Sequence, residues 1–263
     1  MCGAEPDSSE HSFKASVLRR FYRGDWNQRR PEAWPFHFKD GSHSRLKGSN
    51  ANRLKYSDNL CGQCNNNKSS LWDAAYDRLC YWLTSGATKD TAVADLSVVL
   101  GPDVEAQVRN LYKYFAKALG CRLVGATATV PSNFPNPLDN STFGSLLVSI
   151  CRLEPFRGLY NYSSRMGSRI LGKGPLLANL ESRDNGPSES VCNCVWWENI
   201  GYFQISYWFK IEPNPQFGDV LDGLRSTYRI VDCSSLNLKK TGKIMRAWLD
   251  SHRTKEPKGR SGL

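Results

Sequence analysis

The sequence predicts an α+β fold built around a large hydrophobic core. Residues 66–84 and 103–119 carry apolar side chains at spacings of three and four, which is typical of helices with one buried face. Residues 145–153 and 191–211 read as strands. The 263-residue chain contains 8 Trp, 11 Tyr and 11 Phe, which is enough aromatic volume to fill the core of one large domain or two smaller ones.

The first part of the chain, residues 1–86, begins with a predicted turn and short strand over 1–16. A short helix is expected within 14–22, because three apolar residues there fall on one side. Residues 23–56 show poor periodicity and predict loops with one or two short strands, one of them at 34–38. The helix over 66–84 follows, and a glycine just beyond it ends the pattern.

The second part, residues 92–250, follows a linker over 85–91. Its clearest element is the helix over 103–119, which Gly120 is expected to stop. The other predictions, in order, are a strand at 121–130, a proline-rich loop at 131–140, the strand at 145–153, a loop at 172–190, two strands in 191–211 broken near 198–201, a short apolar segment at 228–231, a helical turn at 243–249 and a basic flexible tail at 251–263.

The charge distribution indicates a polyanionic partner. The net charge is +10, and residues 11–55 hold 11 Lys or Arg against three acidic residues. A nucleic acid or an acidic membrane surface would suit this balance. No apolar run approaches the roughly 18 residues of a membrane span. The polar, acidic N-terminus does not resemble a signal peptide, so we expect a cytoplasmic protein without a membrane partner.

Nine cysteines include one pair at metal-ligand spacing. Cys61 and Cys64 are separated by two residues, which is half of a tetrahedral zinc site. Cys2, followed by a glycine, is the candidate partner near the N-terminus. The scattered cysteines, including Cys192 and Cys194, are better explained as small buried residues.

Glu10-His11, the later Asn59, and the run Cys61-x-x-Cys64-Asn65 together resemble the His-Asn-His endonucleases, the ββα-metal nucleases. The resemblance covers residues 1 to about 80. It implies a ββα-metal module over 1–86, with an inserted basic loop region, and a mixed α+β domain over 92–250 that selects a substrate or partner. The implied activity is metal-dependent hydrolysis of phosphodiester bonds in DNA, most simply double-stranded, in a bacterial or phage setting.

The resemblance also implies a role for each residue. His11 would be the general base, Glu10 and Asn65 would hold one Mg²⁺ or Mn²⁺ ion, and Asn59 would fix the loop and orient the histidine. The residues expected to hold phosphates are Lys68 at the helix start and, in the basic region, Arg19, Arg20, Arg29 and Arg30.

The expected structural Zn²⁺ site departs from the family pattern, which uses two Cys-x-x-Cys knuckles. Only Cys2 remains of the first knuckle. Three explanations are open: a thiol encoded before Met1, a further donor such as His37, His43 or water, or a site without zinc. Cys2, Cys61 and Cys64 are the three predicted ligands.

Two other functions compete with the nuclease. The first is a non-catalytic, zinc-stabilised nucleic-acid-binding protein, which the incomplete zinc site favours. The second is an enzyme whose active site lies in 92–263, suggested only by Asp232-Cys233 and Cys192-x-Cys194.

Overall fold

A computed structural model describes residues 2–22, 36–39, 42–56, 59–85, 91–126, 130–131, 134–138, 143, 145–154, 157–158, 161, 171–173, 176–181, 190–210 and 227–232. The helices are α1 (Ala15–Phe21), the 3-10 turn η2 (Asn52–Leu54), the π-helix η3 (Gln63–Lys68), α2 (Ser70–Thr84), α3 (Leu96–Leu100) and α4 (Val104–Gly125). The strands are β1 (Phe36–Lys39), β2 (Ser42–Arg45), β3 (Val93–Asp95), β4 (Leu146–Arg152), β5 (Leu171–Lys173), β6 (Leu177–Glu181), β7 (Ser190–Ile200), β8 (Phe203–Lys210), β9 (Thr227–Arg229) and β10 (Val231–Asp232).

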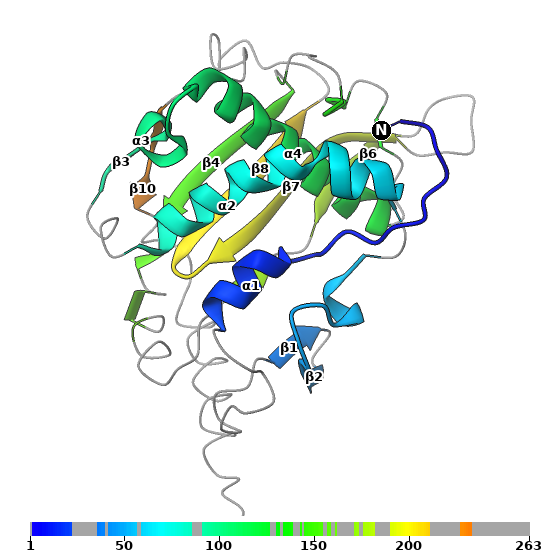
Figure 1. Ribbon diagram of the computed structural model, residues 1–263, viewed down its shortest axis with the longest axis horizontal. Coiled ribbons are helices and arrows are strands. Elements are labelled where there is room, and N and C mark those ends of the chain that lie inside the picture. The colour runs from blue at the N-terminus through cyan, green and yellow to red at the C-terminus, as the bar shows by residue number, and fades with distance from the viewer. Residues whose placement is uncertain are drawn as a thin grey trace, which may run out of the picture.

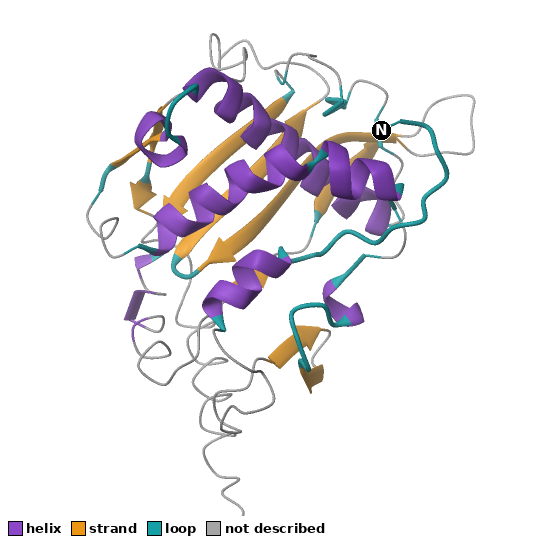
Figure 2. Ribbon diagram, viewed as in Figure 1, coloured by secondary structure: helices purple, strands orange, loops and turns teal. Residues whose placement is uncertain are grey.

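The central feature is a six-stranded sheet with the order β10-β4-β8-β7-β5, in which β6 also pairs with β7. Strands β7 and β8 form a long antiparallel hairpin, closed at Gly201, whose φ of 64° suits glycine. β1 and β2 form a separate small hairpin, and β3 pairs with β9. Figure 2 shows the helices gathered over the large sheet.

Helices α2 and α4 pack against each other and cover one face of this sheet (Figure 1). Alternate residues of β7 and β8 point toward them, and Trp196 and Tyr207 are fully buried there. Phe115 of α4 meets the Tyr207 ring edge-on, with 5.3 Å between centroids. The opposite face is more open, and Trp208 is 49% exposed. The layers are therefore helix on sheet.

A buried carboxylate links α2 to the sheet. Glu198 of β7 accepts hydrogen bonds from the hydroxyls of Tyr76, at 2.6 Å, and Tyr207. Its other oxygen lies 3.7 Å from Lys173 Nζ. Burial lowers the pKa of Lys173, and Glu198 opposes that shift. The carboxylate is thus held by groups from three elements.

Replacing Tyr76 with Phe should lower the free energy of unfolding by about 1.5–3 kcal/mol, because Glu198 would lose a hydrogen bond inside the core. Urea denaturation would measure the loss. Tyr114→Phe is the matched control. Its ring stacks on Tyr76 with centroids 3.9 Å apart, and its hydroxyl does not bond to Glu198. An equal loss in both variants would contradict this explanation.

The α+β class is confirmed, and so are several predicted elements. They include the short helix within 14–22, the helix ending at 84, the strand at 145–153 and the two strands in 191–211. The aromatic residues of 202–209 form part of the sheet core, apart from Trp208. The helical turn predicted at 243–249 and the tail lie outside the described residues.

Two element predictions are wrong, and two elements were not predicted. The strand expected at 121–130 begins instead as helix, because α4 runs through Gly120 to Gly125. Leu119 and Leu123 continue its buried face one turn further, and this outweighs the glycine. The loop predicted over 172–190 contains β5 and β6, which pair with the free edge of the long β7. The strand β3 and helix α3 were not expected.

The N-terminal part does not confirm a ββα-metal module. Two isolated antiparallel bridges, Ser8 with Leu60 and His11 with Lys55, join the N-terminal segment to the chain that leads into η3 and α2. Hydrophobic residues from Val17 to Ile230 belong to one core cluster. Both predicted parts of the chain, 1–86 and 92–250, contribute residues to this cluster. No helix in the described ranges is long and apolar enough to cross a bilayer.

Candidate functional site

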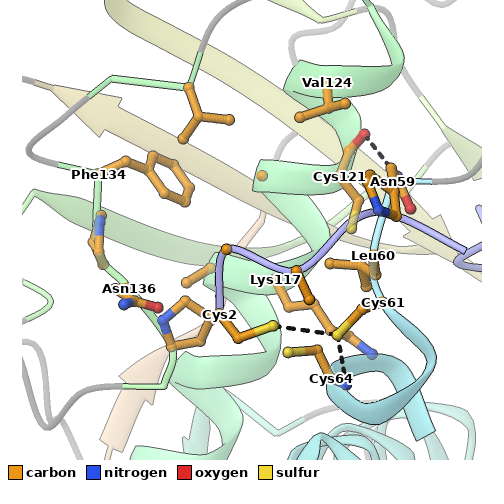
Figure 3. Close-up of a pocket in the computed structure, with 18 residues that line it drawn as sticks. Cys2, Asn59, Leu60, Cys61, Cys64, Lys117, Cys121, Val124, Phe134 and Asn136 are labelled. Atoms are coloured by element: carbon orange, nitrogen blue, oxygen red, sulfur yellow. Dashed lines mark hydrogen bonds between the residues drawn. The ribbon is translucent and has the colours of Figure 1, made fainter. Parts of the chain in front are cut away.

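Three thiols meet beside the start of η3. The sulfur atoms of Cys2, Cys61 and Cys64 all lie within 4.8 Å of one another, and those of Cys2 and Cys61 are 3.3 Å apart. Figure 3 shows the Cys2 and Cys61 side chains pointing toward each other, with Cys64 alongside. The pairing of Ser8 with Leu60 brings the N-terminal segment to the helix start, since Leu60 precedes Cys61 directly.

This cluster could hold a metal ion. Zn–S bonds of about 2.3 Å in a tetrahedral site place sulfur atoms about 3.8 Å apart, which agrees with the observed grouping. Soft thiolates suit zinc rather than magnesium. Among the residues that the structure describes, the group consists of these three thiols, while His37 and His43, predicted as alternative donors, belong to the β1–β2 hairpin.

A cavity of about 340 Å³ adjoins the thiols. Figure 3 shows it between the N-terminal segment, helix α4 and the segment around Phe134 and Asn136. Its walls are mainly apolar, and Val124, Phe134 and three prolines contribute to them. The three thiols form one side of this cavity.

Glu10 lies buried against α4 and α2, at 9% exposure. Its Oε2 accepts a hydrogen bond from Lys117 Nζ at 3.2 Å. Lys117 Nζ also lies 3.0 Å from Asp73 Oδ1. Burial opposes the charge of Lys117, but the two carboxylates outweigh it and raise its pKa above the ordinary value.

One of the two predicted ligands of the divalent ion, Glu10, is therefore already engaged by Lys117. Carboxylate and amide oxygens are the right donors for Mg²⁺ or Mn²⁺. However, one carboxylate oxygen of Glu10, Oε2, already accepts a hydrogen bond from an ammonium group. In this respect Glu10 does not fit the role of a free metal ligand.

The side chain of His11 has different hydrogen-bond partners from the side chain of Glu10. It bridges to Lys55, and the Asn50 side chain forms a hydrogen bond with it. Its Nε2 is buried without a hydrogen-bond partner among the described residues. Burial lowers the pKa of His11, the charge of Lys55 lowers it further, and Asn50 opposes them. The imidazole is therefore held neutral near pH 7, as a proton acceptor must be.

Asn59 and Asn65, the two asparagines predicted to belong to the site, each connect two segments of the chain through hydrogen bonds. Asn65 Nδ2 donates to Ser8 Oγ at 2.9 Å and to Ser9 O at 3.4 Å, so Asn65 lies against the residues just before Glu10. Asn59 Nδ2 donates to the carbonyl of Cys121 at 3.4 Å, and its buried Oδ1 has no partner within the described ranges. Asn59 thus ties the chain to α4.

The predicted phosphate-binding residues differ in availability. Lys68 and Arg19 are exposed. Arg20 packs on α2: its guanidinium lies 5.3 Å from the Tyr81 ring centroid and donates to Asp77 O at 3.4 Å. Arg29 and Arg30 lie outside the described residues. Of the five, Lys68 and Arg19 are the ones positioned at a described surface.

Sequence reasoning missed Lys117, Asp73 and Ser69, which surround Glu10. Ser69 Oγ lies 3.3 Å from Lys117 Nζ. The sequence did contain a sign that Lys117 is buried, because this lysine stands between two alanines in an apolar stretch of the helix. A lysine in such a stretch is rarely buried without an acidic partner.

Comparison with protein-family models, with curated proteins and with solved structures finds no match.

Proposed function

We propose that the protein is a metal-dependent endonuclease that hydrolyses phosphodiester bonds in DNA. The observation that supports this most is the contact of Asn65 with Ser8 and Ser9. It sets the Glu10-His11 segment beside the polar start of η3. The proposal uses three groups, the neutral imidazole of His11, the carboxylate of Glu10 and the exposed lysine Lys68, which are of the types that the reaction class requires.

His11 is the proposed general base. A neutral imidazole can take a proton from water as the water oxygen attacks phosphorus and the bond to the leaving oxygen breaks. The leaving oxygen departs with the electron pair of the broken P–O bond and takes a proton from a solvent water molecule, so that it ends as a hydroxyl. A divalent ion would supply charge neutralisation at the phosphate, with Asn65 and Glu10 as its proposed ligands. Lys68 and Arg19 would hold the DNA backbone.

The three thiols have a structural role in this proposal. A Zn²⁺ ion on Cys2, Cys61 and Cys64 would tie the N-terminal segment to the helix start. The N-terminal segment is joined to the chain before η3 by two isolated bridges, Ser8 with Leu60 and His11 with Lys55, so a metal cross-link beside Leu60 is well placed to stabilise this contact.

Supercoiled plasmid DNA tests the activity. We expect nicking in Mg²⁺ or Mn²⁺ and none after EDTA treatment, because the scissile phosphate needs a cation beside it. Linear and nicked products would be separated on agarose gels. Protein that binds plasmid tightly yet leaves it supercoiled with either ion would overturn the endonuclease proposal.

A second function is favoured by the Glu10–Lys117 pair. A carboxylate already neutralised by an ammonium group is less available to a metal, as expected of a non-catalytic nucleic-acid-binding protein. That protein would bind DNA with an affinity that falls steeply as salt rises, and would not cut it. The plasmid assay separates these two functions.

A further inference from the structure

The ammonium group of Lys117 is buried and surrounded by side-chain oxygen atoms. Its side chain is 0% exposed, and it lies in α4, 107 residues away from Glu10 in sequence. Three oxygen atoms of three different side chains approach its Nζ within 3.0–3.3 Å: Glu10 Oε2, Asp73 Oδ1 and Ser69 Oγ. All three are hard donors of the kind that also bind Mg²⁺ and Mn²⁺.

Charge balance around this group is already satisfied. Lys14 Nζ lies 3.1 Å from the same Asp73 Oδ1 and 3.9 Å from Asp77 Oδ2. A divalent ion added at Glu10 would therefore sit against at least one ammonium group. Like charges at such short range inside a protein repel strongly. An ion bound at Glu10 Oε2 would compete with the ammonium group of Lys117 for that oxygen.

We infer that Lys117 is an internal cation that occupies the position of the divalent ion at Glu10, so that a metal reaches this carboxylate only by displacing the lysine. The inference rests on the proposed function, since it concerns the ligand assigned there. It makes metal binding and the contact between α4 and the N-terminal segment mutually dependent. Without metal, the lysine holds Glu10 in place. With metal, α4 loses that contact.

The alternative is that Lys117 only fastens α4 to the N-terminal segment and leaves metal binding unaffected. The two explanations differ in what removal of the ammonium group does. If Lys117 competes with the metal, its removal strengthens binding at Glu10. If it only fastens the helix, its removal weakens the fold and leaves metal affinity unchanged.

Titration of the purified full-length protein with Mn²⁺, with free ion counted by electron paramagnetic resonance, tests this. Mn²⁺ favours oxygen donors over the thiol cluster. We expect Lys117→Met to bind one Mn²⁺ at least about 10-fold more tightly than the wild type, a change of about 1.4 kcal/mol. Methionine keeps most of the lysine's length and removes its charge. The double variant Lys117→Met/Glu10→Gln should lose the gain.

Lys113→Met is the matched control. Lys113 lies one helical turn from Lys117, and its Nζ sits 5.8 Å from the Trp72 ring centroid. Its removal should leave Mn²⁺ affinity at the wild-type value. Lys117→Gln, which can still donate hydrogen bonds to the oxygens, provides a folded variant if Lys117→Met does not fold, and it too should bind Mn²⁺ more tightly.

Equal Mn²⁺ affinity in the wild type and a folded Lys117 variant would overturn the inference, as would a gain that survives Glu10→Gln. The titration contains no DNA, so it is independent of the plasmid assay. A gain of binding in a protein that never nicks plasmid would contradict the endonuclease and keep the inference. If the wild type nicks plasmid and its Mn²⁺ affinity equals that of Lys117→Met, the endonuclease proposal is kept and the inference about Lys117 is contradicted.

Discussion

Cys64→Ala should remove bound zinc and lower the thermal stability of the protein more than any other substitution considered. A metal that binds the folded state at about 1,000 times its Kd contributes about 4 kcal/mol. Cys64 is 1% exposed, so the variant also loses core packing. Elemental analysis should fall from one zinc per chain to none, and scanning calorimetry should show a lower Tm that EDTA no longer changes.

Cys80→Ala is the control for that result. Cys80 is as buried as Cys64 but lies in α2, away from the thiol cluster. Burial raises the pKa of Cys80 well above its ordinary value, and Cys80 does not belong to the group of three clustered thiols. This variant should keep its zinc and its response to EDTA. Zinc retained at one per chain in Cys64→Ala would show that the thiol cluster is not the metal site.

His11→Ala should reduce plasmid cleavage by about 10²–10⁴-fold, the usual contribution of a general base. DNA affinity should change little, because alanine removes a group that is neutral near pH 7. Cleavage would be followed at saturating protein, and binding by fluorescence anisotropy at several salt concentrations. The lost side chain has one ring nitrogen without a partner, so we expect only a small change in Tm.

His43→Ala, in the β1–β2 hairpin, serves as the histidine control and should cut plasmid at the wild-type rate. Cleavage by His11→Ala within a factor of about three of the wild type would remove His11 from the mechanism. Loss of cleavage together with loss of DNA binding would instead indicate a binding role for this histidine.

The sequence predicted those parts of the fold and site that depend on local patterns. Periodic apolar residues identified α2, and the spacing of Cys61 and Cys64 identified one side of the thiol cluster. Cys2 was found because a thiol near the N-terminus could complete it. Where Gly120 and the apolar stripe disagreed, packing decided the end of α4, and local reasoning failed.

The partners of Glu10 could not be predicted in the same way. Lys117 reaches Glu10 through tertiary packing of α4 on the N-terminal segment, and no local pattern specifies a contact across 107 residues. The same limit explains β6, whose position depends on the exposed edge of β7. Long-range pairing, rather than residue type, carries this part of the structure.

The shared hydrophobic core has a practical consequence for protein engineering. A fragment ending near residue 86 would expose the face of α2 that packs on α4, and would leave Glu10 without its counter-ion. Such a fragment should be insoluble or partly folded. Anyone wishing to fuse the N-terminal segment to a new targeting domain should therefore transfer the chain through α4 and the central sheet as one piece.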